Sequence, residues 1–213
     1  MNLFRAFVVS ATMLVPTPMS VAAQPADVAR LVESGSCTRC DLVGADLSGM
    51  RLMSADLSDA DLRGARLRKT ILYRANLARV DLRGAHVEKA SMGRIDLSGA
   101  RLDGVDLNEA RLAHANLANA RLQGTRLSNT MLEHADLRGA DLTGADLSNA
   151  LLSGSILTGV TLDTADLTGA ILNGAASSGI VGVPTALPVG WQLLNGYLVG
   201  PGTVIPGADL SGV

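Results

Sequence analysis

The sequence predicts an all-β solenoid with a square coil, built from five-residue repeats. From Leu42 to Leu172 every fifth residue is leucine, except Val87 and Met92, and the residue two positions earlier is usually small. Aromatic residues make up only 2% of the chain, so the core must be filled by small, regular side chains. A helix would spread leucines at this spacing over all its sides, and a continuous strand would alternate them between faces. Each pentapeptide must therefore combine a short extended piece with a tight turn.

This geometry points the small residue and the central leucine of each pentapeptide inward, because they are two residues apart on an extended piece. Four pentapeptides then complete one square coil of about twenty residues, and about seven coils stack at the strand spacing of about 4.8 Å. No coil buries its leucines alone, so stability depends on stacking.

The repeat run "ADLRGADLTGADLSNA" at residues 135–150 resembles the pentapeptide-repeat proteins, whose pattern is A(D/N)LxG. The resemblance covers residues 40–174 and implies a right-handed quadrilateral β-helix. It implies little about function, since most members of the family have no known activity.

Residues 1–23 have the pattern of a signal peptide. Arg5 precedes an apolar run, and Val21 and Ala23 place small residues at the −3 and −1 positions of a cleavage site. A membrane anchor is the alternative, but the run is short and is broken by Pro16 and Pro18. We expect export to the periplasm or to the outside of the cell, with no membrane insertion once the leader is removed.

Residues 24–36 are expected to form an N-terminal cap helix and lead-in. Val28, Leu31 and Val32 recur at helical spacing, and Gly35 is a helix stop signal. A solenoid must cover its exposed ends, so this short amphipathic helix is expected to lie over the first coil.

The repeat unit is predicted to span residues 37–174, followed by a non-repeat insertion or cap at 175–206. Within the insertion, Asn195-Gly196 stands between two apolar runs and predicts a two-residue β-hairpin. Trp191 and Tyr197 could cover the last leucines. Residues 207–213, "GADLSGV", match one more pentapeptide in a shifted register.

Arranging the sequence at period twenty assigns the outward residues to four walls. The wall centred on Leu42 and Leu62 mixes aspartates with arginines, which predicts charge compensation, and its corner is a ladder of glycines that predicts positive φ. On the wall centred on Leu57 and Leu77, Asp alternates with Asn on successive coils. That alternation fits either a flat acidic docking surface or a simple relief of repulsion along the ladder, and the second explanation is favoured.

The wall centred on Leu52 and Leu72 is the least polar, and it is the candidate interaction surface. His114 and His134 lie at its corner, one coil apart and near Glu133. Two histidines and one carboxylate are too few ligands to indicate a metal site, so none is predicted. The candidate surface residues are Ile71, Tyr73, Arg74, Arg94, His114, Met131, His134 and Leu151.

Cys37 and Cys40 are the two cysteines of the chain. Counting back from Leu42 places Cys37 at a central position and Cys40 at a small inward position, across the first corner of the repeat. The ends of a tight turn lie within about 7 Å, close to the separation that a disulfide requires. We therefore expect a structural disulfide in an oxidising compartment, rather than an accessible redox centre.

The sequence favours a non-catalytic exported rod that serves as a scaffold or a protein-interaction module. No nucleophile, base and orienting group converge, and a filled rod offers no pocket, so an enzyme is not expected and no cofactor is predicted. The net charge of −2 gives no support for a nucleic-acid partner. The resemblance to the pentapeptide-repeat family implies one alternative, a DNA-mimicking protein that binds and protects topoisomerase, should the leader be retained. The other alternative is a disulfide redox protein acting through Cys37 and Cys40.

Overall fold

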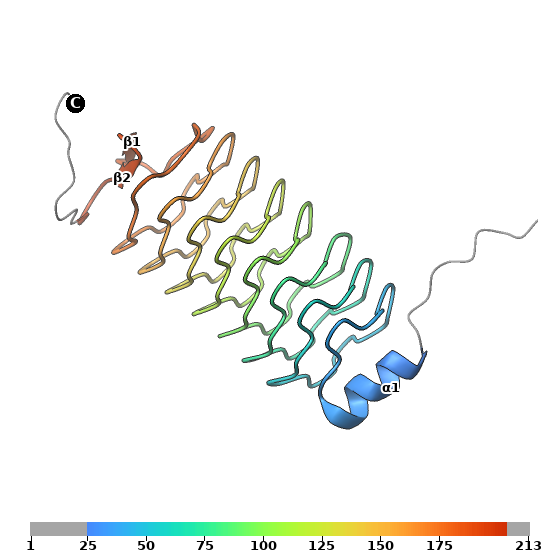
Figure 1. Ribbon diagram of the computed structural model, residues 1–213. Helices are drawn as coiled ribbons and strands as arrows, with labels where there is room; N and C mark the ends of the chain where they lie inside the picture. Colours follow the sequence, from blue (N-terminus) through green and yellow to red (C-terminus); the bar gives the residue numbers. More distant parts are fainter. Residues whose placement is uncertain (1–24, 204–213) are drawn as a thin grey trace, which may run out of the picture.

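The computed structural model describes residues 25–203, so the expected signal peptide (1–23) and the expected final repeat (207–213) lie outside the described residues. Figure 1 shows a rod of stacked coils, with helix α1 (Pro25–Ser34) across one end. A hairpin of β1 (Gln192–Leu194) and β2 (Tyr197–Val199) lies at the other end. In the described part of the chain, no helix has the length and apolarity needed to cross a membrane.

The coils have the predicted period of twenty residues. Parallel bridges join each residue that precedes a central position to its counterpart twenty residues later, from the pair Ser36 and Asp56 to the pair Asp166 and Ala186. Each pentapeptide contributes one bridged residue, so the coils are held by isolated bridges rather than by long strands.

Nearly every backbone N–H of a pentapeptide finds an acceptor, which explains the repeat pattern. In residues 61–65, three N–H groups donate to carbonyls of adjacent coils, and the N–H of Ala65 closes the turn on the Leu62 carbonyl at 3.0 Å. The remaining N–H, that of Arg63, donates to Oδ1 of Asp61 at 3.1 Å. The same side-chain bond recurs at every Asp or Asn before a central residue from residue 41 to residue 166. The Asp or Asn of the motif therefore satisfies a donor that the coil leaves free.

The core is a column of central residues, none more than 5% exposed between Leu42 and Leu172. The small inward column lies beside it. Where threonine replaces alanine there, its hydroxyl donates to the carbonyl of a central residue one coil earlier, as Thr125 Oγ1 does to Leu102 O at 2.8 Å. Ser155 is the exception, because its buried Oγ has no hydrogen-bond partner in the described part of the chain.

All four corners of the coil have a left-handed backbone. The predicted glycine ladder has positive φ, from Gly44 at 67° to Gly144 at 65°, and Thr164 continues it at 55°. The glycine pattern predicted this conformation at one corner only, but Lys69 and Arg94 at two other corners have φ of 58° and 55°. A tight turn with positive φ at its third residue closes every pentapeptide, and non-glycine residues accept the steric cost there.

Helix α1 caps the first coil and ends at the predicted stop, where Gly35 has φ of 68°. Leu31 is buried at 1% exposure, and Val28 packs against the core. Val32 was expected on the same inward face, but it is 58% exposed. The helix therefore packs on the coil through Val28 and Leu31, and its third apolar side chain faces solvent.

The coil register extends beyond residue 174, the boundary expected from the motif. Bridges and backbone hydrogen bonds continue to Ala186, although the leucine pattern stops at Leu172, because backbone pairing does not need the motif side chains. The hairpin then lies on the last coil, with the N–H of Ile180 donating to Gly196 O at 3.0 Å. Its fully buried residue is Leu198, while Trp191 is partly buried against the core.

Candidate interaction surface

One wall of the rod carries the candidate surface, and we call it the arginine wall. Its outward residues lie at 51, 53 and 54 and at the same three positions on each later coil, as far as 171, 173 and 174. Within these columns Arg51, Arg74, Arg94 and Arg111 are exposed, and the one acidic residue is Glu133. The arginine wall is therefore net positive, although the chain as a whole is net negative.

The four arginines of this wall have no ion pair with any residue from 25 to 203, which sets them apart from most arginines elsewhere on the rod. Of the other arginines in residues 25–203, all but Arg39 lie within ion-pair distance of a carboxylate. Arg74 and Arg94 occupy the same corner on consecutive coils, where Arg74 N–H donates to Gly93 O at 3.1 Å. Two like charges are thus stacked one coil apart without a counter-charge, an arrangement that is unfavourable unless a partner supplies one.

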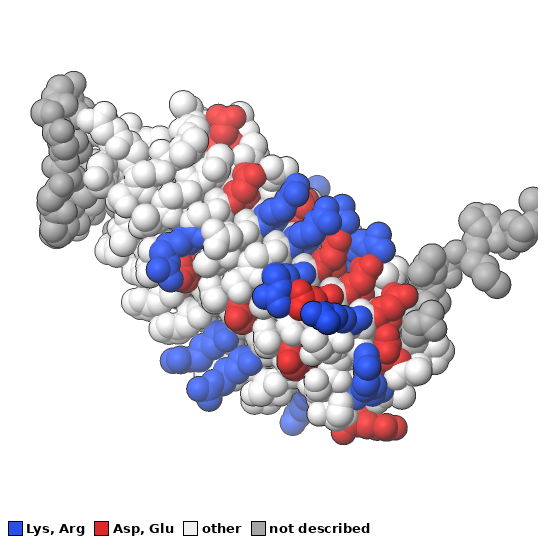
Figure 2. Space-filling model, viewed as in Figure 1, with Lys and Arg blue, Asp and Glu red and all other residues white. Residues whose placement is uncertain are grey.

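The same wall becomes apolar towards the C-terminal end. Met131, Leu151 and Ile171 are bridged in succession on three consecutive coils. Met131 is 39% exposed and Ile171 is 43% exposed, while Leu151 is half-buried. No Asp, Glu, Lys or Arg occurs between residues 167 and 203, and on the face drawn in Figure 2 this end of the rod is mostly white.

Two other predicted surface residues are less available than the sequence suggested. Tyr73 is half-buried, and its ring lies against Gly93 on the next coil, where an added Cβ would be 3.3 Å from the ring. Ile71 is half-buried between its bridge partners Arg51 and Ser91. Both side chains therefore lie along the surface of the wall and do not project from it.

His114 and His134 stack with ring centroids 5.0 Å apart and an interplanar angle of 14°. The His134 ring also covers Gly154, because a Cβ there would overlap it. Glu133 does not join the histidines in a compact group. The one close cluster of three potential metal-ligating residues in the described chain is Asp27, Cys37 and Cys40.

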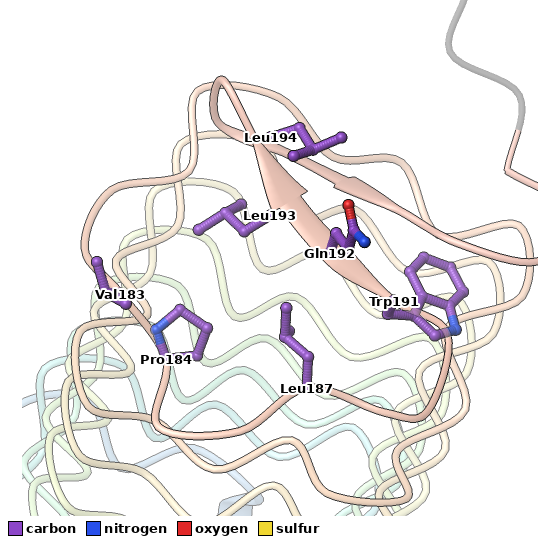
Figure 3. A pocket seen from close by; sticks show the side chains of 7 residues that line it. All are labelled: Val183, Pro184, Leu187, Trp191, Gln192, Leu193 and Leu194. Atoms are coloured by element: carbon purple, nitrogen blue, oxygen red, sulfur yellow. The ribbon is translucent and has the colours of Figure 1, made fainter. Parts of the chain in front are cut away.

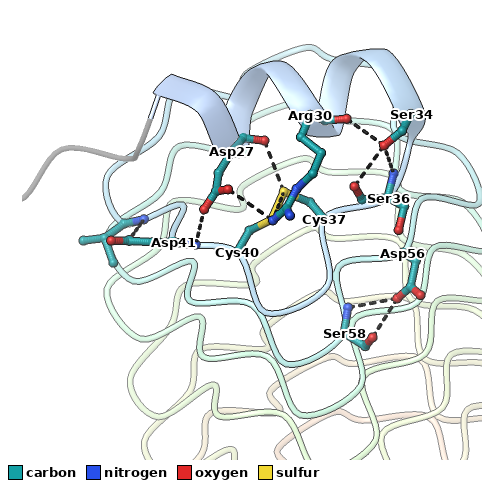
Figure 4. Close-up of a disulfide and its surroundings, with 10 residues drawn as sticks. Asp27, Arg30, Ser34, Ser36, Cys37, Cys40, Asp41, Asp56 and Ser58 are labelled. Carbon is teal, nitrogen blue, oxygen red and sulfur yellow. Dashed lines mark hydrogen bonds and ion pairs between the residues drawn. A yellow bond between two sulfur atoms is a disulfide. The ribbon is translucent and has the colours of Figure 1, made fainter.

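The cysteine pair lies beneath α1, at the first corner of the coil (Figure 4). Cys37 and Cys40 are each 1% exposed, and the structure joins their sulfur atoms with a Cα–Cα distance of 5.3 Å. The Arg30 guanidinium contacts Cys40 Sγ and bonds Asp27 at 3.1 Å. Asp27 in turn accepts a hydrogen bond from the backbone N–H of Asp41 at 2.8 Å, so helix, cysteines and first coil form one unit.

The alternating Asp and Asn wall is linked by side-chain hydrogen bonds. Asn76 Nδ2 donates to Asp56 Oδ1 at 3.0 Å, and Asn116 Nδ2 donates to Asp96 Oδ1 at 3.1 Å. Bonds to the Ser58 hydroxyl and N–H hold the pKa of Asp56 below its usual value. Each amide separates two carboxylates, which supports relief of repulsion as the reason for the alternation.

On the first wall, arginines neutralise the aspartate ladder. Arg63 Nε donates to Asp61 Oδ1 at 2.8 Å, and Arg83 makes the equivalent bond to Asp81 at 2.9 Å. The bond from Arg63 lowers the pKa of the Asp61 carboxyl. Most of the charge on this wall is paired within the rod, so the wall offers less to a partner than the arginine wall does.

An apolar hollow lies beside the hairpin at the C-terminal end (Figure 3). The Trp191 ring covers Gly200, where no side chain could fit, and Val183 is 73% exposed at the rim. The hollow is shallow and contains no ionisable side chain. The residues that line it are Val183, Pro184, Leu187, Trp191, Gln192, Leu193 and Leu194.

Comparison with known proteins identifies the repeat. The family model for pentapeptide repeats matches eight copies, at residues 36–68, 75–113, 110–149 and 145–176. A search of curated proteins found no significant match.

Solved structures of pentapeptide-repeat proteins are similar to this chain. HetL, a protein involved in the regulation of heterocyst differentiation in the cyanobacterium Nostoc sp. strain PCC 7120, is 31% identical. The match covers 69% of this chain and 80% of HetL, with a TM-score of 0.50. A pentapeptide-repeat protein from the Arabidopsis thaliana thylakoid lumen is 26% identical over 65% of this chain and 72% of its own, with a TM-score of 0.32. QnrB1, a plasmid-mediated fluoroquinolone resistance protein, is 23% identical over 66% of this chain and 71% of its own, with a TM-score of 0.39.

The family match spans well over half of the chain, and its members form right-handed β-helices. The resemblance inferred from the A(D/N)LxG pattern is thereby confirmed. The chain belongs to the pentapeptide-repeat family.

Proposed function

We propose that this protein is a non-catalytic, exported rod that binds a protein partner through the arginine wall. The observation that carries the proposal is a set of four arginines without an ion pair in residues 25–203, on one flat wall that also exposes apolar side chains. They are Arg51, Arg74, Arg94 and Arg111. A carboxylate in an interface would give each guanidinium a bidentate, charge-assisted partner. Export rests on the signal-peptide pattern of residues 1–23.

The other candidate functions find less support. A DNA mimic needs a continuous acidic face, but here arginines such as Arg63 and Arg83 pair with the aspartate ladder. A redox role for Cys37 and Cys40 needs solvent access, and both are buried beneath α1. The hollows on the described part of the rod are open and shallow, so they do not enclose a substrate as the pockets of enzymes do.

The test compares charge reversals that differ in position but not in kind. The Arg74→Glu and Arg94→Glu variants, alone and together, are used as baits in chemical crosslinking of envelope fractions. Arg39→Glu is the matched control, because Arg39 is also unpaired and also occupies a corner with positive φ, 58°, but on another wall. We expect one partner that the parent protein and the Arg39→Glu variant recover equally and the double variant loses. Equal recovery by the double variant would remove the arginine wall as the binding surface.

A further inference from the structure

The arginine wall presents side chains in ladders with one rung per coil. The corner column places Arg74 and Arg94 on consecutive coils, and the bridged column places Met131, Leu151 and Ile171 on three consecutive coils. Neighbouring coils are paired as parallel strands are, so the rungs repeat at about 4.8 Å along the rod. A partner that follows the rod must therefore present side chains at nearly the same interval.

An extended partner does not match this interval. Side chains on one face of a strand repeat at about 6.6–6.8 Å, so they drift from the rungs by about 2 Å at each step. An α-helix presents one turn every 5.4 Å, which drifts by only about 0.6 Å per coil. Over the three rungs from Met131 to Ile171, a helix stays within about 1.2 Å of register, whereas a strand falls about 4 Å out of register.

A strand would also gain no backbone hydrogen bonds from this wall. The N–H of Ile71 donates to Met50 O at 2.9 Å, and the N–H of Leu72 donates to Ser91 O at 2.8 Å. The wall backbone is thus already paired between coils, and strand addition needs a free sheet edge. Recognition must come from side chains, and helix-in-groove or helix-on-face binding uses side chains alone.

The chemistry of the wall changes along its length. Arginines without an ion pair in residues 25–203 occupy the coils from Arg51 to Arg111, which also expose Met53, and the bridged column is apolar from Met131 to Ile171. Complementarity then requires carboxylates at one end of the partner segment and apolar side chains at the other. A helix is about 10–12 Å across with its side chains, so it can lie on one flat wall and reach both columns.

We propose that the segment bound by the arginine wall is an amphipathic α-helix lying along the rod axis. Its acidic turns face Arg74 and Arg94, and its apolar turns face Met131, Leu151 and Ile171. This inference rests on the proposed function, because it names the kind of partner that the same wall binds.

The test uses synthetic peptides and the full-length protein. One peptide has Glu on two successive turns and Leu on three later turns of one helical face. A second has the same composition with Glu and Leu at alternate positions, and a third carries a central proline that breaks the helix. Binding is measured by the fluorescence anisotropy of labelled peptide, and circular dichroism checks that every protein variant folds.

We expect the helical peptide to bind at least about tenfold more tightly than the other two. Arg74→Glu with Arg94→Glu should weaken it about tenfold or more, and a peptide with both Glu replaced by Lys should restore binding to that variant. Ile171→Lys tests the apolar end separately and should also weaken binding, while Arg39→Glu should not.

Equal or tighter binding of the alternating peptide would overturn the inference, as would no binding of any peptide. In either case, loss of a crosslinked partner from the double variant would show that the wall still binds a protein and that only the helical partner is wrong. Arginine-dependent binding to vesicles of phosphatidylglycerol, with no peptide binding, would overturn it in favour of a lipid surface.

Discussion

Ser155 offers a test of how much stability the rod loses when a polar group in the inward column has no hydrogen-bond partner. Its side chain is 0% exposed and its Oγ has no partner in the described chain, whereas the residues one coil before and after it, Ala135 and Ala175, are alanines. A buried, unsatisfied hydroxyl costs about 1–3 kcal/mol. Ser155→Ala removes that cost and loses only the contacts of one oxygen, so we expect a gain of about 1 kcal/mol in unfolding free energy.

The gain should raise the thermal midpoint by about 2–4 °C for a chain of this size. Differential scanning calorimetry of the full chain measures it, with midpoints compared because repeat rods can unfold in more than one step. Thr125→Val is the matched control, since it removes the hydroxyl that donates to Leu102 O at 2.8 Å and should lower the midpoint. A lower midpoint for Ser155→Ala would refute the reasoning, because it would mean that the hydroxyl has a favourable partner.

Three further predictions concern the core, the wall charges and the first corner. Leu107→Ala should lower the unfolding free energy by about 2–5 kcal/mol, because it removes a side chain that is 1% exposed; an unchanged denaturation midpoint would contradict an inward leucine. Arg138 lowers the pKa of Asp136, so their pairing stabilises the fold above the ordinary carboxyl pKa of about 3.9 and is lost as the pH falls through the lowered value. The thermal midpoints of the parent and Arg138→Gln should therefore differ at pH 7 and converge towards pH 2, and a constant difference would count against the pair. Thiol titration of the exported, non-reduced protein should find Cys37 and Cys40 unreactive even after denaturation, and two titratable thiols would show that no disulfide forms.

Which side chains fill the core could be predicted from the sequence. The contacts of the outward side chains could be predicted only in part. Leucine and alanine face inward because a turn in every pentapeptide is the one arrangement that keeps residues at a five-residue spacing on the same side of the chain. The pairing of outward charges depends on side-chain direction, which spacing does not determine. Arg63 bonds Asp61 in its own pentapeptide, whereas Arg79 bonds Asp59 on the preceding coil. Which arginines remain unpaired therefore became visible only in the structure.

The limits of the coil were also only partly predictable. The leucine pattern ends at Leu172, yet backbone bridges continue to Ala186, because pairing between coils uses main-chain groups that every residue carries. Similarly, glycine at one corner indicated positive φ there, but lysine, arginine and histidine adopt the same conformation at other corners. Turn closure imposes positive φ at every corner, and glycine only lowers the steric energy of that conformation.

The twenty-residue register places two different constraints on how such a rod can change in length. Inserting or deleting one pentapeptide leaves every leucine inward, so the core would tolerate it. Placed between Arg94 and Met131, the same change would rotate all later residues by a quarter turn and move Met131, Leu151 and Ile171 to a different side from Arg74 and Arg94. The interior thus accepts length changes in units of five, while a continuous binding surface accepts them only in units of twenty. A relative that differs by one or two pentapeptides could keep the fold and lose the surface.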